Sequence, residues 1–239
     1  MNKYFTAFFL LVLSFFYIFF SNDSGGGRVF VNLLTFAGIY GLAAIGINVH
    51  FGWTGLLNFG HAAFMGIGAY TTVLLIPHSL GREGVVISTG LPLPLAIILG
   101  LIASALLGLL LGLPTLRLRG DYLAIVTIAA AEIFRLLVRD FEDLTGGVYG
   151  IIQFSDSLQN SRPDFITQFS ENYNISSAQL WVGLLTWFSI VFVLIILARL
   201  KKSPWGRALR AVREDEDAVR ALGKNAVLLK LQSFMLGAA

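Results

Sequence analysis

Long apolar runs recur along this sequence, and they constrain its fold more than any other feature. A helix needs about 20 consecutive apolar residues to cross the hydrocarbon core of a bilayer. Runs near or above this length occupy residues 4–20, 30–51, 56–76, 91–113, 122–137 and 181–200. The pattern predicts an all-α fold, namely a polytopic membrane helix bundle with about six complete spans plus the start of a further one.

The apolar runs at the two ends of the chain need separate interpretation. The run at residues 4–20 follows a single basic residue, Lys3, and is either a retained first span or a signal peptide. We favour the retained span, because SNDSGGG offers no small-x-small cleavage site and the run is long for a signal core. The last apolar stretch, residues 226–239, is too short to cross. We therefore expect residues 1–239 to form one transmembrane domain that is incomplete at its C-terminus.

The composition argues against several classes of protein. Charged residues make up 13% of the chain, about half their share in a typical soluble domain. The net charge of +3 fits the excess of Lys and Arg in cytoplasmic loops better than it fits nucleic-acid binding. Without cysteine, and with only three scattered histidines, the sequence favours no metal site. It also has no GxxxxGK[ST] phosphate-binding loop, so we expect this chain itself to bind no cofactor.

Residues 201–230, with the sequence KKSPWGRALRAVREDEDAVRALGKNAVLLK, form the one long charged passage. Pro204 suits the first turn of a helix over Trp205–Val212. Asp215 can cap a second short helix that Gly223 closes with a positive φ. Two interpretations stay open from the residues alone: a solvated hairpin between two spans, or a docking element for a cytoplasmic partner.

The basic residues give the orientation of the predicted spans. If residues 201–225 are a cytoplasmic segment, alternation of the spans places Lys3, Arg117 and Arg119 on that same side. The long mixed loop at residues 138–179 then lies on the opposite side. This agreement with the excess of Lys and Arg in cytoplasmic loops supports the count of six spans.

Two polar pairs within apolar runs are candidate functional residues. Asn58 and His61 are three apart in a run rich in Gly and Ala, so we expect them on one helix face. Glu132 and Arg135 have the same spacing and can pair on one face of the fifth span. Each pair either bonds within the bundle as a structural contact or lines a substrate path, since polar groups at membrane depth are costly.

Four segments, in this order and spacing, resemble the permease subunits of branched-chain amino acid ABC importers, the Liv-type family. They are GWTGLLNFGHAAFMGIGAY, LRLRGDYLAIVTIAAAEIFRLL, LTGGVYGI and GRALRAVREDEDAVRALG. The second and fourth are more similar to the M-type subunit than to the H-type. The resemblance extends from about residue 30 to the end of the chain, and it favours the docking interpretation of the charged segment.

The resemblance implies a permease domain in the bacterial inner membrane that imports branched-chain or other neutral amino acids. Its implied partners are a second, homologous permease, two cytoplasmic ATPase subunits that bind ATP and magnesium, and a periplasmic substrate-binding protein. The ATPase-coupling motif of the family falls on Gly206, Arg213, Glu214, Asp215, Ala221 and Gly223. Related importers carry urea or short amides, so these solutes remain the alternative.

Other functions fit the sequence less well. A membrane-embedded enzyme would need a nucleophile with a base, or clustered carboxylates or histidines, and the sparse polar residues offer no such spacing. A secondary transporter would usually carry more ionisable residues within its spans than Glu132 and Arg135.

Overall fold

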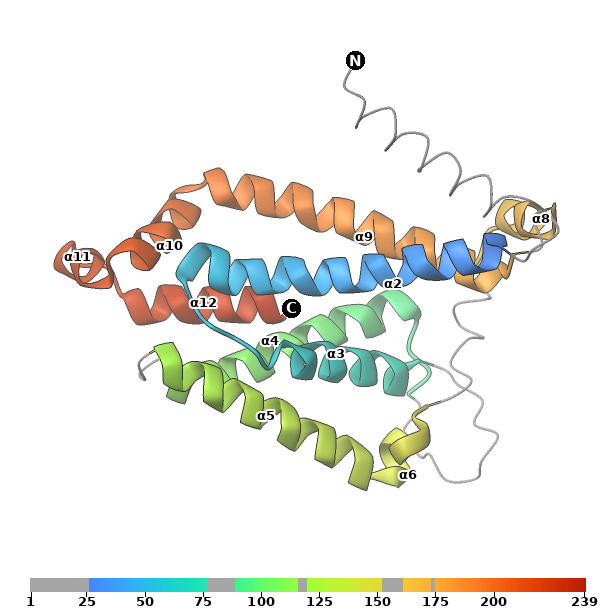
Figure 1. Cartoon of the computed structure of the whole chain (residues 1–239), viewed down its shortest axis with the longest axis horizontal. Helices are drawn as coiled ribbons and strands as arrows, with labels where there is room; N and C mark the ends of the chain where they lie inside the picture. Colours follow the sequence, from blue (N-terminus) through green and yellow to red (C-terminus); the bar gives the residue numbers. More distant parts are fainter. Residues whose placement is uncertain (1–25, 77–88, 116–119, 152–160, 173–174) are drawn as a thin grey trace, which may run out of the picture. The chain divides into compact units, whose positions relative to one another are not determined.

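The computed structural model describes residues 26–76, 89–115, 120–151, 161–172 and 175–239, and it contains no strand among them (Figure 1). The helices, in chain order, are α2 (Gly26–Ile47), the π-helix η1 (Asn48–Trp53), α3 (His61–Leu75), α4 (Leu93–Thr115), α5 (Gly120–Asp140), α6 (Glu142–Thr145), the 3-10 helix η2 (Gly147–Tyr149), α8 (Asp164–Asn172), α9 (Ser177–Lys202), α10 (Pro204–Glu214), α11 (Glu216–Ala221) and α12 (Ala226–Ala238).

Three of these helical segments are long and apolar enough to cross a membrane: residues 27–53, 93–115 and 177–202. Two more, α3 and α12, are apolar but shorter. The predicted first span lies outside the described residues, and α5 carries charged side chains in its C-terminal half. The all-helical, multi-pass membrane class is confirmed in these residues. The count of six complete spans stays a prediction.

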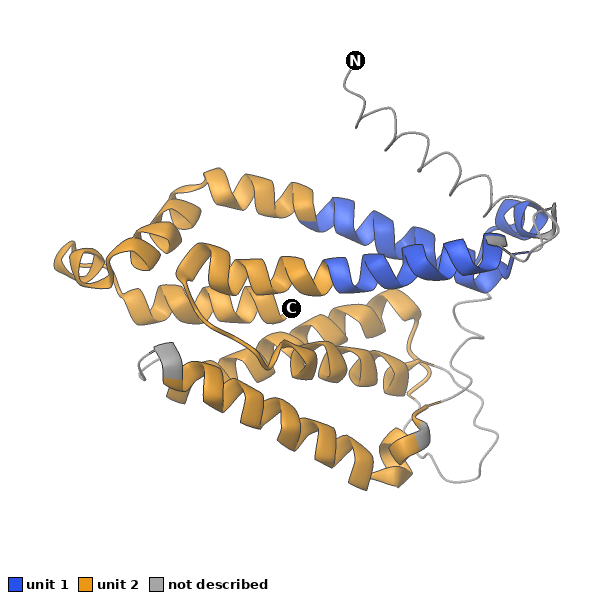
Figure 2. Cartoon of the chain, viewed as in Figure 1, with its two compact units in different colours: residues 1–41, 158–193 blue, residues 42–157, 194–239 orange. Residues whose placement is uncertain are grey.

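The chain divides into two compact units (Figure 2). Residues 1–41 and 158–193 form one unit, in which the first part of α2 packs against the first part of α9. Trp187 Nε1 donates to the Leu34 carbonyl oxygen at 3.2 Å. A Cβ on Gly38 would lie 2.7 Å from the Thr186 methyl carbon, so the glycine permits this close approach.

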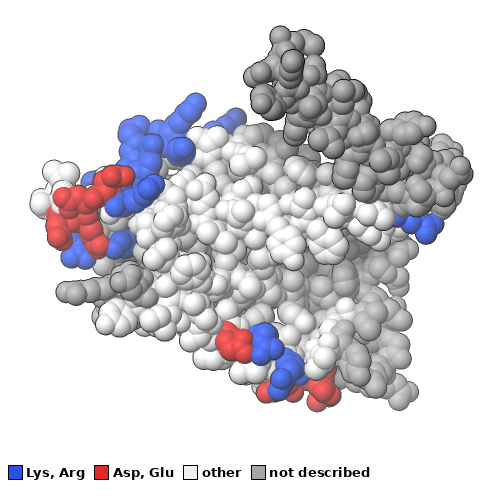
Figure 3. Space-filling model, viewed as in Figure 1, with Lys and Arg blue, Asp and Glu red and all other residues white. Residues whose placement is uncertain are grey.

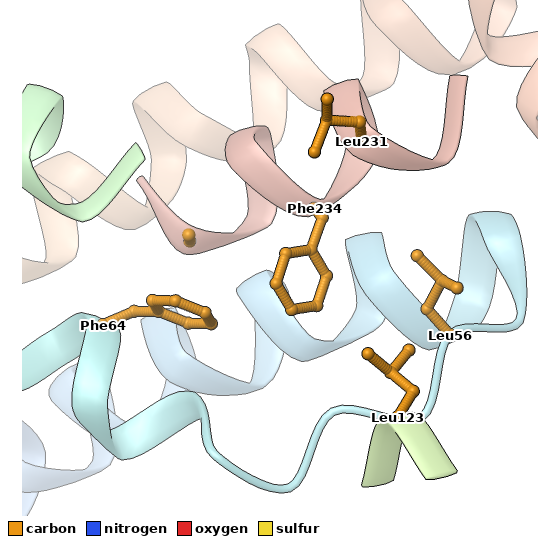
Figure 4. Packing of buried hydrophobic residues seen from close by; sticks show 6 residues of the cluster. Leu56, Phe64, Leu123, Leu231 and Phe234 are labelled. Carbon is orange, nitrogen blue, oxygen red and sulfur yellow. The ribbon is translucent and has the colours of Figure 1, made fainter. Parts of the chain in front are cut away.

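Residues 42–157 and 194–239 form the second unit, whose largest buried cluster joins α3, α12 and the segments beside them (Figure 4). Phe64 of α3 and Phe234 of α12 are almost fully buried, and their rings meet edge to face with centroids 5.6 Å apart. Leu56, Leu123 and Leu231 complete the labelled part of the cluster. This unit contains all of the predicted site residues.

Two predicted boundaries are corrected. The span expected to end at residue 51 continues as η1 to Trp53, and the span expected over residues 56–76 is the shorter helix α3. Gly55 adopts a φ of +70°, in the left-handed region that a glycine enters at little cost. Residues 55–60 form an irregular connection, although the apolar run predicted helix from residue 56.

The loop expected over residues 138–179 is also more ordered than predicted. Helix α5 continues three residues beyond the predicted end at Leu137, and α6, η2 and α8 follow within the loop. Thr145 holds the first of these turns, because its hydroxyl donates to the carbonyl oxygens of Val138 and Phe141. Gly146 ends α6 with a φ of +73°.

The charged side chains of the second unit gather in two places (Figure 3). One group of Lys, Arg, Asp and Glu covers α10, α11 and the adjoining end of α9, and a smaller group lies along α5 and α6. The surface between them is uncharged in this view. This separation is typical of a protein whose charged ends lie in water and whose apolar band lies in lipid.

The packing of α3 on α4 gives a test of the bundle. A Cβ on Gly100 would lie 2.8 Å from the Gly68 carbonyl oxygen, closer than such atoms approach. We expect Gly100→Ala to lower the free energy of unfolding by about 1–3 kcal/mol through overpacking. The measurement is denaturation in detergent, followed by tryptophan fluorescence. Leu101→Ala, at a neighbouring exposed position, is the control. Equal stability of the Gly100→Ala variant and the wild type would contradict the observed packing.

Candidate functional site

Asn58 and His61 do not share a helix face, so this prediction is wrong. Asn58 lies in the irregular connection, and His61 is the first residue of α3. The Asn58 side chain bonds locally instead, because its Oδ1 accepts from the Gly60 N–H at 2.9 Å. Asn and Asp side chains often compete with helical hydrogen bonds in this way. Asn58 is 5% exposed and His61 is 7% exposed, so both are buried within the chain.

His50 of η1 joins this polar group, which we call the histidine cluster: His50, Asn58 and His61. The Asn58 amide nitrogen lies 3.0 Å from His50 Nδ1, and His50 Nε2 lies 2.9 Å from the Phe234 carbonyl oxygen. A carbonyl oxygen only accepts, so the network assigns the proton to Nε2 and leaves Nδ1 to accept from Asn58. His50 is therefore a neutral ring. Through its two nitrogens it joins the irregular connection at residues 55–60 to α12.

Glycines make room for the two imidazole rings. A Cβ on Gly46 would lie 2.6 Å from His61 Nε2, and a Cβ on Gly237 would overlap the His50 ring. The two rings meet edge to face with centroids 5.6 Å apart. Within the part of the chain that the structure describes, His61 Nδ1 has no hydrogen-bond partner.

The hydrogen bonds that join His50 to Asn58 and to the Phe234 carbonyl oxygen were not predicted from the sequence. The 184-residue separation of His50 from Phe234 leaves no local pattern to detect. The available signal was that His50 is one of few polar side chains in the apolar run at residues 30–51.

The C-terminal end of η1 is held by hydrogen bonds from several segments. Ser233 Oγ of α12 donates to the Val49 carbonyl at 3.0 Å, and Thr54 Oγ1 donates to the His50 carbonyl at 2.7 Å. Arg213 Nη1 of α10 donates to the Gly52 carbonyl at 2.8 Å. π-Helical turns are frequent at functional sites. Here the turn is the point where α3, α10 and α12 are all connected to α2.

Glu132 and Arg135 pair as predicted. Arg135 donates through Nε to one carboxylate oxygen at 2.9 Å and through Nη2 to the other at 2.6 Å. Their side chains are 53% and 61% exposed respectively. The structure thus places two of the four predicted pathway residues in the histidine cluster and the other two on the exposed side of α5. No cluster suited to a metal ion occurs among the described residues.

The charged segment folds as its sequence predicts. Pro204 lies in the first turn of α10, and the Asp215 carboxylate accepts from the backbone N–H groups of Asp217 and Ala218 at 3.0 and 2.9 Å. Gly223 follows α11 with a φ of +74°. Gly206 lies against the end of α9, where a Cβ would come within 2.9 Å of Lys201 Cα. The Pro204 start, the Asp215 cap and the glycine after α11 are confirmed, whereas α10 continues two residues beyond the predicted end at Val212, to Glu214.

Glu216 connects α11 to α12. Its carboxylate pairs with Arg220 at 2.7 Å within α11, and with Lys230 of α12. Partial burial raises the pKa of Glu216, but the hydrogen bonds and charges of Lys230 and Arg220 together hold this pKa below its usual value. A small buried cluster contains one residue from each of the three helices: Val212, Val219 and Ala226. Helices α10, α11 and α12 therefore pack as one assembly.

Comparison with known proteins gives several relatives. The high-affinity branched-chain amino acid transport system permease protein LivM of Salmonella typhimurium is 39% identical over 220 residues, which cover 87% of this chain and 49% of the relative. The probable branched-chain amino acid transport permease protein LivM of Methanocaldococcus jannaschii is 28% identical, over 87% of this chain and 63% of its own length. LivH of Escherichia coli K12 is 28% identical, over 87% and 65% respectively.

The chain spans about half the length of the Salmonella LivM that it matches. Its identity to that LivM is higher than to LivH, as the resemblance to the M-type subunit predicted. No solved structure matches the chain. A sequence profile of one family matches residues 29–239, and the chain therefore belongs to the family described as branched-chain amino acid transport system / permease component.

Proposed function

We propose that this chain is a transmembrane permease subunit of an ATP-driven importer, which carries branched-chain or other neutral amino acids across the bacterial inner membrane. The family match over residues 29–239 is the observation that carries the proposal. The relatives named LivM and LivH support an amino acid as the solute. The chain would move the solute and not transform it.

The proposed complex has several other subunits. A second, homologous permease completes the membrane part, two cytoplasmic ATPase subunits bind ATP and magnesium, and a periplasmic protein delivers the solute. The exposed, charged surface of α10 and α11 supports ATPase docking, because it is a capped element, packed on α12, at the charged end of the second unit (Figure 3). A short helix of this kind can seat in a groove of a partner and move with it.

Glu132 and Arg135 are the proposed solute contacts at membrane depth. An amino acid presents a carboxylate and an ammonium group, and this pair offers one charge of each sign. Because the pair is more than half exposed on α5, it is available to a solute or to a second permease. Asn58 and His61 are buried, so in the proposed path they reach a solute only when the connection 55–60 moves.

Uptake of labelled solutes tests the proposed substrate. Cells that lack this chain should lose uptake of leucine and alanine at limiting concentration, and re-expression should restore it. Urea uptake should be unchanged. Loss of urea uptake alone would leave an importer but replace the amino acid with urea or short amides as its solute.

Glu132→Gln tests the charge pair. The substitution removes the negative charge and weakens the contact to Arg135, so we expect uptake to fall about tenfold with normal assembly. Asp140→Asn, at the end of the same helix, is the matched control and should transport normally. Normal uptake by Glu132→Gln at normal expression would make the pair purely structural.

The docking segment is tested by the double substitution Glu214→Ala, Asp215→Ala, which we expect to fold but to bind the ATPase subunits less tightly. Asp215 also caps α11, and losing a cap costs about 1 kcal/mol. Glu214→Ala with Asp215→Asn keeps a capping side chain while removing the same charges. Co-purification should weaken for both doubles. Weakening confined to the first would assign the effect to the cap, and unchanged co-purification of both would remove the docking role.

A further inference from the structure

Arg213 belongs to the proposed docking segment, yet its guanidinium contacts a different part of the chain. Its Nη1 donates to the Gly52 carbonyl oxygen, 161 residues earlier in the sequence. A Cβ on Gly55 would lie 3.4 Å from Arg213 Cγ, so the stem of the side chain lies beside the connection 55–60. One side chain of α10 thus contacts both the end of η1 and the start of that connection.

The position of Gly52 near the C-terminal end of η1 explains why a positively charged side chain, that of Arg213, donates to its carbonyl oxygen. The last four carbonyls of a helix have no partner within it, and the dipole makes that end negative. The carbonyls of Val49, His50 and Phe51 receive donors from Ser233, Thr54 and the Gly55 N–H respectively. The Gly52 carbonyl receives its donor from α10, and that donor is charged.

The apolar contact around this hydrogen bond fixes α10 against η1. Leu209, one helical turn before Arg213, is fully buried in a cluster with Val49 and Trp53. The rings of Trp53 and Trp205 meet edge to face with centroids 6.2 Å apart. Leu209 and Arg213 lie on the same face of α10, because residues four apart are neighbours on a helix surface.

The histidine cluster contacts η1 through His50, which is part of this helix. Gly52 lies two residues after His50, and His50 holds Asn58 and the Phe234 carbonyl. A displacement of α10 that pulls on Gly52 therefore acts on the ring that fixes the connection 55–60. Packed elements with discrete arrangements transmit such shifts better than flexible ones.

We infer that Arg213 is a positioning residue inside the permease: it transmits movement of α10 to η1 and the connection 55–60, and it is not a contact to the ATPase subunits. The inference rests on the proposed function. It divides the coupling segment by contact and not by burial, because Arg213 is exposed like Glu214 and Asp215: Arg213 donates to η1, whereas the Asp215 carboxylate bonds to α11 within the segment itself.

The test uses the assembled importer with Arg213→Met, which keeps an apolar stem and removes the donor. The ATPase subunits should co-purify and hydrolyse ATP as with the wild-type chain, whereas uptake should fall about tenfold, the scale expected when a hydrogen bond from a charged donor is lost. Arg213→Lys keeps a charged donor and should retain more uptake. Arg199→Met removes an exposed arginine from the last turn of α9, outside the segment, and is the matched control.

A direct readout comes from the connection itself. The chain has no cysteine, so Phe59→Cys, at a position that is 64% exposed, gives a single labelling site in this subunit. With Arg213 present, its maleimide labelling rate should differ between nucleotide-free and vanadate-trapped complexes. In the Arg213→Met background this difference should disappear. If the Met variant does not accumulate, Arg213→Gln is judged by the same criteria.

Two results would overturn the inference: loss of the ATPase subunits from the Arg213→Met complex, which would make Arg213 a docking residue, or uptake and labelling equal to the wild type. A wild-type complex without ATP-dependent uptake would instead refute the proposed function. The two failures are therefore distinguishable in the same experiment.

Discussion

The lack of water in the hydrocarbon core is the constraint on which this structure depends, because each backbone group there must find a partner within protein. The segment formed by α2 and η1 ends at Trp53, and the carbonyls at that end are satisfied from α10, α12 and the residues that follow. Bonds made to satisfy a helix end thus also join elements that are far apart in the sequence. The same need explains why the polar side chains of this region are buried together.

The two groups of predicted pathway residues meet this constraint in opposite ways. Asn58 and His61 are both buried: Asn58 bonds to the unpredicted His50 in a neutral, directed network, whereas His61 Nδ1 has no hydrogen-bond partner among the described residues. Glu132 and Arg135 neutralise each other across two hydrogen bonds and stay exposed. A buried neutral network favours one fixed geometry. An exposed pair keeps the freedom to exchange its partner for a solute of complementary charge.

The sequence predicted local features better than it predicted the candidate site. The caps around Pro204 and Asp215 follow from residues within one turn of each other, and the structure has them where they were expected. The ion pair of Glu132 and Arg135 was also predictable, since its spacing is helical. The placement of Asn58 was not, because the apolar run that begins at residue 56 contains no local signal that the helix starts only at His61. The partner of His50 depends on α12, whose position only tertiary packing determines.

The glycines beside the two imidazole rings link positions that are far apart in the chain. Gly46 leaves space for His61, and Gly237 leaves space for His50, while the backbones around both glycines approach closely enough that a Cβ on Gly237 would lie 2.8 Å from the Gly46 carbonyl oxygen. A side chain at either position would need the volume that a ring now fills. Each glycine is therefore required twice, by a ring and by the backbone of the other glycine's helix, so a smaller residue in place of a histidine would still leave no room for a side chain at Gly46 or Gly237.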